Sequence, residues 1–308
     1  MRTLQKEVYE VAMINEESFI ETVYMKGLQI SLVASGDGTE VIYHRLEPET
    51  MWGIEPEEGW DSLEFLHILS GELTLPYEGE SFKAGDSFHK HPITEHYIFK
   101  SIGETEFLYV TSQPVFHYYS KATKELMDLS VAIEEKDGYT VDHCQRINKL
   151  SMMVGEEMGL EKKRLKSLNI ASFLHDVGKL KIPLEILQKP GKLTSDEWMI
   201  MKQHSRYGRE LLENIGLPFL KEAGKVVEQH HERYDGKGYP YGLEGDNILT
   251  EAAIISVVDS YDAMTSNRIY QKARAKEVAF NEILRCRGTM YNPQVVDVFL
   301  ALKNKIIL

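Results

Sequence analysis

The spacing of the apolar residues changes near residue 115, and this change constrains the fold more than any other feature. Before it, Gly, Pro, Asp and Ser separate short apolar runs, as in strands joined by hairpin turns. These runs lie at Gln29 to Val33, Val41 to Leu46, Leu63 to Leu69, Glu72 to Leu75 and Phe107 to Thr111. After it, Leu168 and Ala171 lead to His175 at steps of three and four, the period of a helix. We therefore predict a multidomain α and β protein, with an N-terminal β-barrel followed by an all-α domain.

Turn and helix signals predict where these domains meet. A chain of 308 residues is long enough for about two domains, each with its own core. Gln113-Pro114 ends the strands, and 118–135 has the pattern of a helix. Thr194 and Glu197 form a capping box at the start of another helix. We expect a barrel at 1–114, a linker helix at 115–135 and a helical domain at 136–308.

Composition limits the classes of partner and the compartment. With 48 acidic and 35 basic residues, the net charge of -13 repels polyanions, which argues against binding to a nucleic-acid polymer. The two cysteines, Cys144 and Cys286, are expected to be thiols in a reducing compartment. No apolar stretch has the length of a signal peptide or a membrane span. The expected location is cytoplasmic, away from membranes.

Imidazoles and carboxylates gather at two places in the C-terminal half. His175 and Asp176 precede Gly178 and Lys179, and His230-His231-Glu232 follows about fifty residues later with the loop 235–240. His175 continues the apolar stripe of its helix and so faces inward. Asp176 is displaced by about 100° on the same helix, which Gly178 is expected to end. Such groups suit two transition-metal ions that share one carboxylate, with a lysine facing a bound anion.

Further polar residues share buried helix faces. His204 follows Trp198 and Met201 at helical steps, and Asp259 and Asp262 follow an apolar helix start. Buried carboxylates and imidazoles are costly unless they are paired or bound to metal. Each group also has a simpler explanation, because a single His-Asp pair is often a hydrogen-bonded surface pair and Asp-Gly is an ordinary turn. The whole set favours a metal-dependent phosphodiesterase.

The segment from about Lys136 to Leu308 resembles the HD-GYP domain family, metal-dependent phosphodiesterases that hydrolyse cyclic di-GMP. The resemblance rests on Glu135-Lys136-Asp137-Gly138-Tyr139-Thr140 leading to His143 and Arg146, on His175-Asp176-Val177-Gly178-Lys179, on Lys189-Pro190-Gly191-Lys192-Leu193-Thr194 leading to His204, on His230-His231-Glu232 with Asp235-Gly236-Lys237-Gly238-Tyr239-Pro240, and on Asp259-Ser260-Tyr261-Asp262-Ala263-Met264-Thr265.

The resemblance implies a role for individual residues. The implied metal ligands are His143, His175, Asp176, His204, His230, His231 and Asp259. Asp176 would bridge two divalent ions and act in catalysis with Lys179. Lys179 and Arg268 would contact the substrate phosphates, and Tyr239 would line the guanine-binding loop. This set of imidazoles favours iron or manganese over magnesium and leaves zinc open.

One departure from the family bears on the product. Some members carry a glutamate one helical turn before the first histidine, which gives a third metal, and here that position is Tyr139. We therefore expect a two-metal site that opens cyclic di-GMP to the linear dinucleotide pGpG rather than to GMP.

The N-terminal half is similar to a cupin barrel. The similarity lies in 64–73 and in Gly85-Asp86-Ser87-Phe88. Glu58-Gly59-Trp60 stands where metal-binding cupins have His-x-His, so the metal triad is missing. His89 and His91 leave a second metal site open as an alternative to ordinary surface histidines. The resemblance implies a sensory or dimerising module, with a small-molecule effector and a homodimer.

Two other functions stay open at this point. The same pocket in a non-hydrolysing receptor would bind cyclic di-GMP and report it. A phosphohydrolase for another cyclic dinucleotide, such as cyclic GMP-AMP, would use the same metals with different pocket walls.

Overall fold

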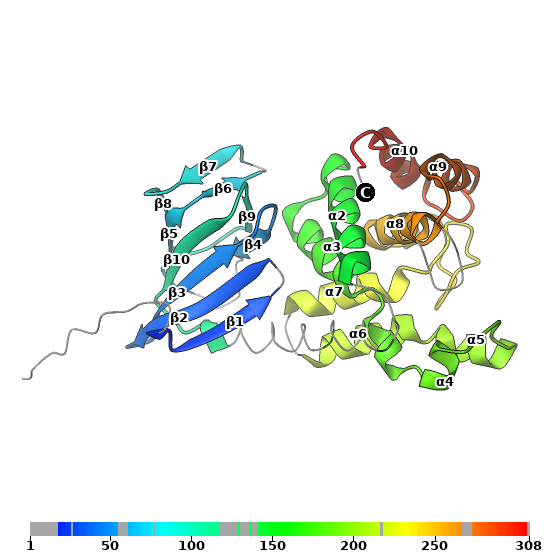
Figure 1. Ribbon diagram of the computed structural model, residues 1–308, viewed down its shortest axis with the longest axis horizontal. Helices are drawn as coiled ribbons and strands as arrows, with labels where there is room; N and C mark the ends of the chain where they lie inside the picture. Colours follow the sequence, from blue (N-terminus) through cyan, green and yellow to red (C-terminus); the bar gives the residue numbers. More distant parts are fainter. Residues whose placement is uncertain are drawn as a thin grey trace, which may run out of the picture. The chain divides into compact units, whose positions relative to one another are not determined.

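The computed structural model of the chain describes residues 18–25, 27–54, 61–76, 78–117, 129, 136, 141–215, 218–266 and 273–306. The chain divides into two compact units, 1–124 and 125–308 (Figure 1). The predicted fold class is confirmed, because unit 1 is built of antiparallel β-strands and unit 2 is helical. The division falls inside the predicted linker helix, most of which lies outside the described residues.

Unit 1 consists of two antiparallel sheets. The larger has the order β1-β2-β3-β10-β5-β8 and the smaller the order β4-β9-β6-β7. The larger sheet contains β1 (Glu21–Met25), β2 (Leu28–Gly36), β3 (Thr39–Leu46), β10 (Thr105–Thr111), β5 (Glu64–Ser70) and β8 (Ser87–Lys90). The smaller contains β4 (Met51–Ile54), β9 (Tyr97–Ser101), β6 (Glu72–Leu75) and β7 (Glu80–Lys83). The predicted strand runs are therefore confirmed in β2, β3, β5, β6 and β10.

The core of unit 1 follows from alternation along these strands. In β10 every second residue is buried, and Phe107 is fully buried between its neighbours. Leu66 and Ile68 of β5 and Phe99 of β9 are fully buried in the same apolar cluster. Alternation of this kind buries one face of each strand and leaves the other toward solvent.

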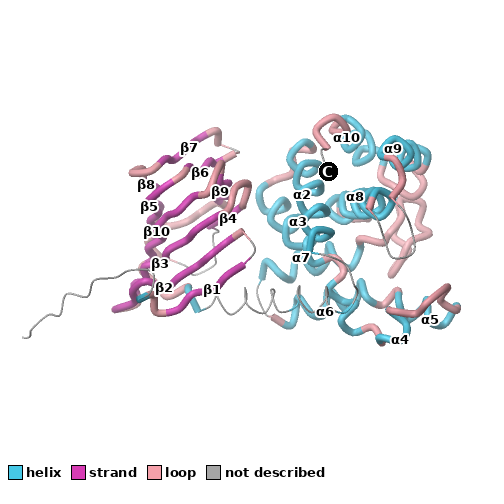
Figure 2. Tube along the Cα trace, viewed as in Figure 1, coloured by secondary structure: helices cyan, strands magenta, loops and turns pink. Residues whose placement is uncertain are grey.

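Unit 2 is built around α8, whose apolar residues are buried on most sides, as expected of a central helix. Its helices are α2 (Val141–Glu157), α3 (Lys162–Leu174), α4 (Leu184–Leu187), α5 (Ser195–Met201), α6 (His204–Asn214), α7 (Pro218–Gln229), α8 (Thr250–Thr265), α9 (Lys276–Arg285) and α10 (Pro293–Ala301), with 3-10 helices η2 (Val177–Lys181) and η3 (Gly245–Asn247). The connection from α7 to α8 is mostly loop (Figure 2). Within the described residues, no helix has the length and apolarity needed to cross a membrane.

The start of α5 confirms the predicted capping box. The Glu197 backbone N–H donates to Thr194 Oγ1 at 3.3 Å, and the Thr194 backbone N–H donates to Glu197 Oε2 at 2.7 Å. This reciprocal pair satisfies two donors at the start of the helix. It places α5 directly before the turn that leads to His204.

Candidate metal centre

The end of α3 is where the centre begins. Leu165, Leu168 and Ala171 are buried along one side of α3, and His175 follows them as its fully buried C-terminal cap. The helix ends at Leu174, so Asp176 caps η2 rather than continuing α3. The expectation that both residues share one helix was therefore wrong, because His175 caps the end of α3 and Asp176 caps the start of η2.

Gly178 allows η2 to lie directly against α6. A Cβ atom at this position would come within 1.8 Å of the His204 carbonyl oxygen and 2.4 Å of the Gly208 nitrogen. Side chains larger than hydrogen therefore cannot occupy this position without separating the two elements. The expectation that Gly178 ends a helix was wrong, since it lies inside η2 and brings His204 to Asp176.

All seven predicted metal ligands are brought together in two groups. In each group, one ligand atom from every residue lies within 4.8 Å of the others. The first group contains Asp176, His204, His230 and His231, and the second contains His143, His175 and Asp259. Residues of α2, α6 and α8 and residues that directly follow α3 and α7 thus converge on one place.

Three of the imidazoles are held by backbone carbonyls. Nδ1 of His175 donates to the Ser172 carbonyl at 3.0 Å, and Nδ1 of His204 and of His230 donates to the carbonyls of Met201 and Val227 at 2.8 and 2.6 Å. Because a carbonyl only accepts, each Nδ1 carries a proton, and in the neutral ring each Nε2 then has a lone pair directed at the centre.

Two of these lone pairs are buried without a hydrogen bond. Nε2 of His175 and of His230 has no hydrogen-bond partner among the described residues. Buried polar atoms are nearly always satisfied, so two buried nitrogens without a hydrogen bond require an explanation. A metal cation is the partner that unprotonated imidazole nitrogens prefer, so these residues fit a metal.

Asp176 lies between the two groups. Its Oδ1 is 3.5 Å from His204 Nε2, and its Oδ2 is 3.4 Å from His175 Nε2. Lys179 Nζ donates to Oδ2 at 2.8 Å. One carboxylate oxygen therefore faces each group, which is the arrangement that a shared ligand requires.

The electrostatics of the centre depend on Asp176. Burial alone would raise the pKa of its carboxyl group, but Lys179 and His175 hold that pKa well below its usual range. Burial would also lower the pKa of His175, yet the Asp176 carboxylate raises it to about 9. Burial lowers the pKa of His230 to about 3. The carboxylate is thus ionised and attracts a cation, whether a proton or a metal, to the neighbouring Nε2.

A second carboxylate, Asp262, was not assigned a role from the sequence. It is 1% exposed, it is 2.7 Å from His143 Nδ1, and it accepts from Arg146 Nε and Nη2 at 2.5 and 3.0 Å. Burial would raise the pKa of Asp262, but these hydrogen bonds hold it well below its usual range. Asp262 orients His143 as a carbonyl orients His175. The sequence held a signal for this role. Asp262 lies three residues after Asp259, and Arg146 lies three residues after His143, so each pair lies on one helix face.

The loop after α7 folds back over the centre. The Tyr239 ring lies 4.8 Å from the His231 ring with an interplanar angle of 31°. Gly238 permits this path, because a Cβ there would come within 2.3 Å of the Arg233 nitrogen. Among the other predicted site residues, Lys179 is at the centre, and Arg268 lies outside the described residues, as does Tyr139.

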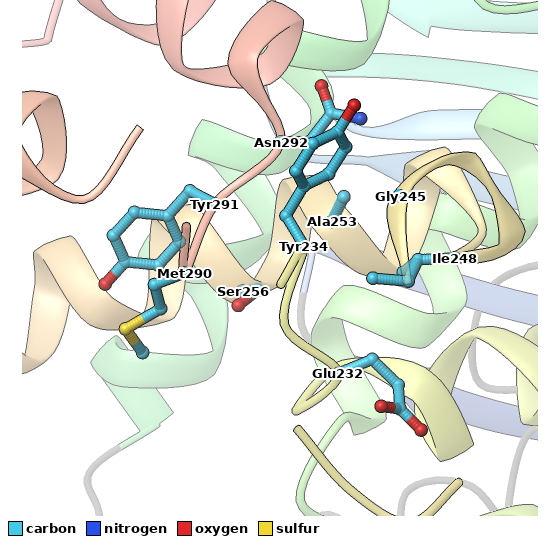
Figure 3. Close-up of a pocket in the computed structure, with 9 residues that line it drawn as sticks. All are labelled: Glu232, Tyr234, Gly245, Ile248, Ala253, Ser256, Met290, Tyr291 and Asn292. Carbon is cyan, nitrogen blue, oxygen red and sulfur yellow. The ribbon is translucent and has the colours of Figure 1, made fainter. Parts of the chain in front are cut away.

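Glu232 holds this loop in place. Its carboxylate is 2% exposed and accepts from the backbone N–H groups of Tyr241, Gly242 and Leu243 at 2.7, 3.2 and 3.0 Å. Figure 3 shows Glu232 at a small cavity that Tyr234 and other residues line, and none of the seven candidate ligands is among them. No role for Glu232 was predicted from the sequence.

The N-terminal histidines do not form a comparable group. His89 is exposed on β8, and His91 pairs with Asp61 at 3.0 Å on the surface. Among the described residues, neither belongs to a cluster of three groups that could hold a metal ion.

Comparisons with known proteins identify relatives of this chain. The family model described as HD domain matches residues 129–295. A cyclic di-GMP phosphodiesterase of Thermotoga maritima is 39% identical over 64% of this chain and 54% of its own length. The cyclic di-GMP phosphodiesterase response regulator RpfG of Xanthomonas campestris is 41% identical over 57% and 46%. The 3'3'-cGAMP-specific phosphodiesterase 2 of Vibrio cholerae is 35% identical over 58% and 35%. The chain thus spans about half the length of the first two relatives.

Proposed function

This chain belongs to the HD domain family, and on that premise we propose that it is a metal-dependent phosphodiesterase that hydrolyses cyclic di-GMP. The observation that carries the proposal is Asp176, whose two oxygens face two groups of buried histidines. Two relatives that carry this activity in their names support the choice of substrate.

Two divalent ions are proposed to occupy the centre, with iron or manganese as the metal. His143, His175 and Asp259 would hold one ion, and His204, His230 and His231 the other, with Asp176 shared. When bound, two such ions polarise a phosphoryl group and lower the pKa of a water molecule. The imidazole-rich donor set is the reason to favour these metals over magnesium.

The residues around the centre are proposed to bind and orient the substrate. Lys179 is tied to Asp176 and so carries its positive charge beside the metals, where it would donate to a phosphate oxygen whose charge grows in the transition state. Arg268 is proposed as a second phosphate contact from the sequence alone. Tyr239 covers His231 and would line the pocket for the guanine base.

The proposed product is pGpG. Hydrolysis of one of the two phosphodiester bonds consumes one water molecule and leaves the second bond intact. A seven-residue ligand set that divides into two groups supports a two-metal centre and a single opening step. The protein is proposed to work in the cytoplasm, on a nucleotide and not on a nucleic-acid polymer.

Unit 1 is proposed to tune this activity as a sensory or dimerising module. Its two antiparallel sheets, together with the sequence similarity to a cupin barrel, support a small-molecule effector and a homodimer. The proposed domains are the cupin-like unit at 1–114, a linker helix at 115–135 and the phosphodiesterase domain at 136–308.

Cyclic GMP-AMP is the second candidate substrate, because one relative is named for that specificity. A receptor that binds cyclic di-GMP without hydrolysis is the third candidate. The two groups of ligands and Lys179 favour hydrolysis over simple binding.

The test is turnover by protein loaded anaerobically with Fe(II) or Mn(II). Cyclic di-GMP, cyclic GMP-AMP and cyclic di-AMP are incubated separately, and the products are resolved by chromatography. We expect metal-dependent formation of pGpG, its loss in Asp176→Ala, and full activity in the exposed control Asp246→Ala. Intact cyclic di-GMP that binds would indicate the receptor, and preferential cleavage of cyclic GMP-AMP would indicate the second candidate.

A further inference from the structure

Helix α5 exposes three large apolar side chains beside the centre. Trp198, Met199 and Ile200 are 47%, 54% and 40% exposed. The Trp198 ring meets the Tyr239 ring edge-on, with centroids 6.3 Å apart and an interplanar angle of 80°. Tyr239 in turn lies on His231. A row of rings therefore leads from a candidate metal ligand to an exposed tryptophan.

Lys202 adds positive charge to the same place. It follows Trp198 by four residues, so the two side chains share one helix face. Its Nζ lies 5.9 Å from the centroid of the Tyr239 ring. Trp198, Tyr239 and Lys202 thus combine an exposed aromatic surface with a cationic donor.

The position of this group relative to the centre is fixed by the backbone. The carbonyl of Met201, the last residue of α5, accepts a hydrogen bond from Nδ1 of His204, and Lys202 follows as the C-cap of this helix. A phosphate at the metal centre beside His204 and a base on Trp198 would therefore be separated only by the short, hydrogen-bonded stretch of chain between these two residues. This suits a nucleotide, in which phosphate and base are joined covalently.

We propose that Trp198 is a stacking platform for a purine base of the substrate, and that Lys202 donates to the acceptor edge of that base. Every nucleobase has a π-face that stacks on an aromatic ring. Guanine presents two acceptors, O6 and N7, on its major-groove edge, whereas adenine pairs N7 with an amino donor. An ammonium group at this edge therefore favours guanine. The inference rests on the proposed function, and it adds the residues that select the base.

Kinetics of three variants on α5 test the platform in the full-length, metal-loaded protein. Trp198→Ala is expected to raise KM for cyclic di-GMP by about 5- to 150-fold, the range that base stacking contributes, with a much smaller change in kcat. Trp198→Phe keeps an aromatic face and is expected to restore most of the loss. Met199→Ala is the matched control, since it truncates a more exposed apolar side chain on the same helix. An equal KM in Trp198→Ala and Met199→Ala overturns the inference.

Lys202→Met tests the choice of base. Methionine keeps most of the length of the side chain without its charge, so the variant should lose preference for cyclic di-GMP over cyclic di-AMP. The preference is measured as the ratio of the two kcat/KM values. An unchanged ratio overturns the role of Lys202 and leaves stacking by Trp198 to its own test.

Fluorescence separates this inference from the proposed function. Cyclic di-GMP stacked on Trp198 should quench tryptophan emission in the wild-type protein and in Met199→Ala, and the quenching should be lost in Trp198→Phe. This readout does not require turnover. A wild-type protein that cleaves no cyclic dinucleotide yet shows this pattern would disprove the hydrolase and support the platform. Equal quenching in wild type and Trp198→Phe, or no binding to wild type, overturns the platform.

Discussion

Both units bury histidines, but the side chains that surround these histidines differ. In unit 1, His44 is 3% exposed, and its ring stacks on Phe107 with centroids 4.7 Å apart and near Trp52. Burial lowers the pKa of His44 to about 3. In unit 2, His175 is equally buried, but it faces a carboxylate that raises its pKa to about 9. The same side chain is thus part of an apolar core in one unit and part of a charged centre in the other.

The difference shows which observations identify a metal site. Burial does not, because His44 and His175 share it. A metal site is identified by two other features: one ring nitrogen is anchored, and the other faces a shared carboxylate. The described contacts place both features around Asp176. Variants in the two units are therefore expected to have different effects. Those near the centre in unit 2 should change metal binding, and those at His44 in unit 1 should change the stability of the unit.

The largest effect is expected from Gly178→Ala. The added Cβ would overlap the His204 carbonyl, so η2 must move away from α6 and the two ligand groups must separate. We expect a loss of more than about 3 kcal/mol in the stability of unit 2 and the loss of metal binding. Calorimetry and metal content measure the two effects.

Gly224→Ala is the matched control for this change. A Cβ at Gly224 would approach no atom closer than 3.4 Å, which is ordinary contact. Its metal content should match that of the wild type. Normal metal content in Gly178→Ala would show that η2 and α6 need no close approach.

A smaller effect is expected from Asp262→Ala. His143 would lose the carboxylate at its Nδ1 and with it a fixed orientation. Loss of such a partner lowers metal affinity by about 10- to 100-fold. Competition with a chelator measures the affinity, and Asp297→Ala, which breaks an exposed pair with Arg287, serves as the control. Equal affinities in the two variants would refute the orienting role of Asp262.

The stability of unit 1 is expected to depend on pH through His44. Above pH 6.5 the histidine is neutral in both folded and unfolded chains. Below it, the unfolded chain binds a proton that the folded unit excludes until about pH 3, so the free energy of unfolding falls as the pH falls. The loss is about 1.4 kcal/mol for each pH unit in this window.

Denaturant titrations of unit 1 at pH 7 and pH 5 measure this dependence. His44→Phe should remove most of the difference, since phenylalanine does not titrate and fits an aromatic environment. His89→Phe changes an exposed histidine and should leave it intact. A pH dependence that persists in His44→Phe would assign the effect to other groups.

The smallest effect is expected from Glu232→Gln. The amide nitrogen would face one of the backbone N–H groups that now donate to the carboxylate. Because two donors cannot form a hydrogen bond, the loop that carries Tyr239 would loosen. A weakened hydrogen bond of about 1 kcal/mol corresponds to a roughly fivefold rise in KM. Metal content should not change, because Glu232 belongs to neither ligand group. Glu244→Gln, exposed on the same loop, should behave as wild type in steady-state assays; a KM for Glu232→Gln equal to this control would rule out the role in the loop.

Local patterns were enough to predict much of the fold. The strand at 107–111 and the capping box at Thr194 involve neighbours in the sequence, and both are confirmed. The role of Asp262 could not be predicted this way, because its contact with His143 spans 119 residues. The close approach of Gly178 to His204 likewise depends on how two elements pack. The candidate ligands came from a family resemblance, and their convergence became visible only in three dimensions.

The central claim is that Asp176 joins two metal ions in one centre, and electron paramagnetic resonance of the Mn(II)-loaded protein tests it most directly. Two Mn(II) ions that share a carboxylate are exchange-coupled, so we predict two equivalents of bound manganese per chain and a coupled multiline spectrum in the wild type. Asp176→Ala should lose that spectrum. A spectrum of isolated Mn(II) in the wild type, or a coupled spectrum that persists in Asp176→Ala, would contradict the shared carboxylate.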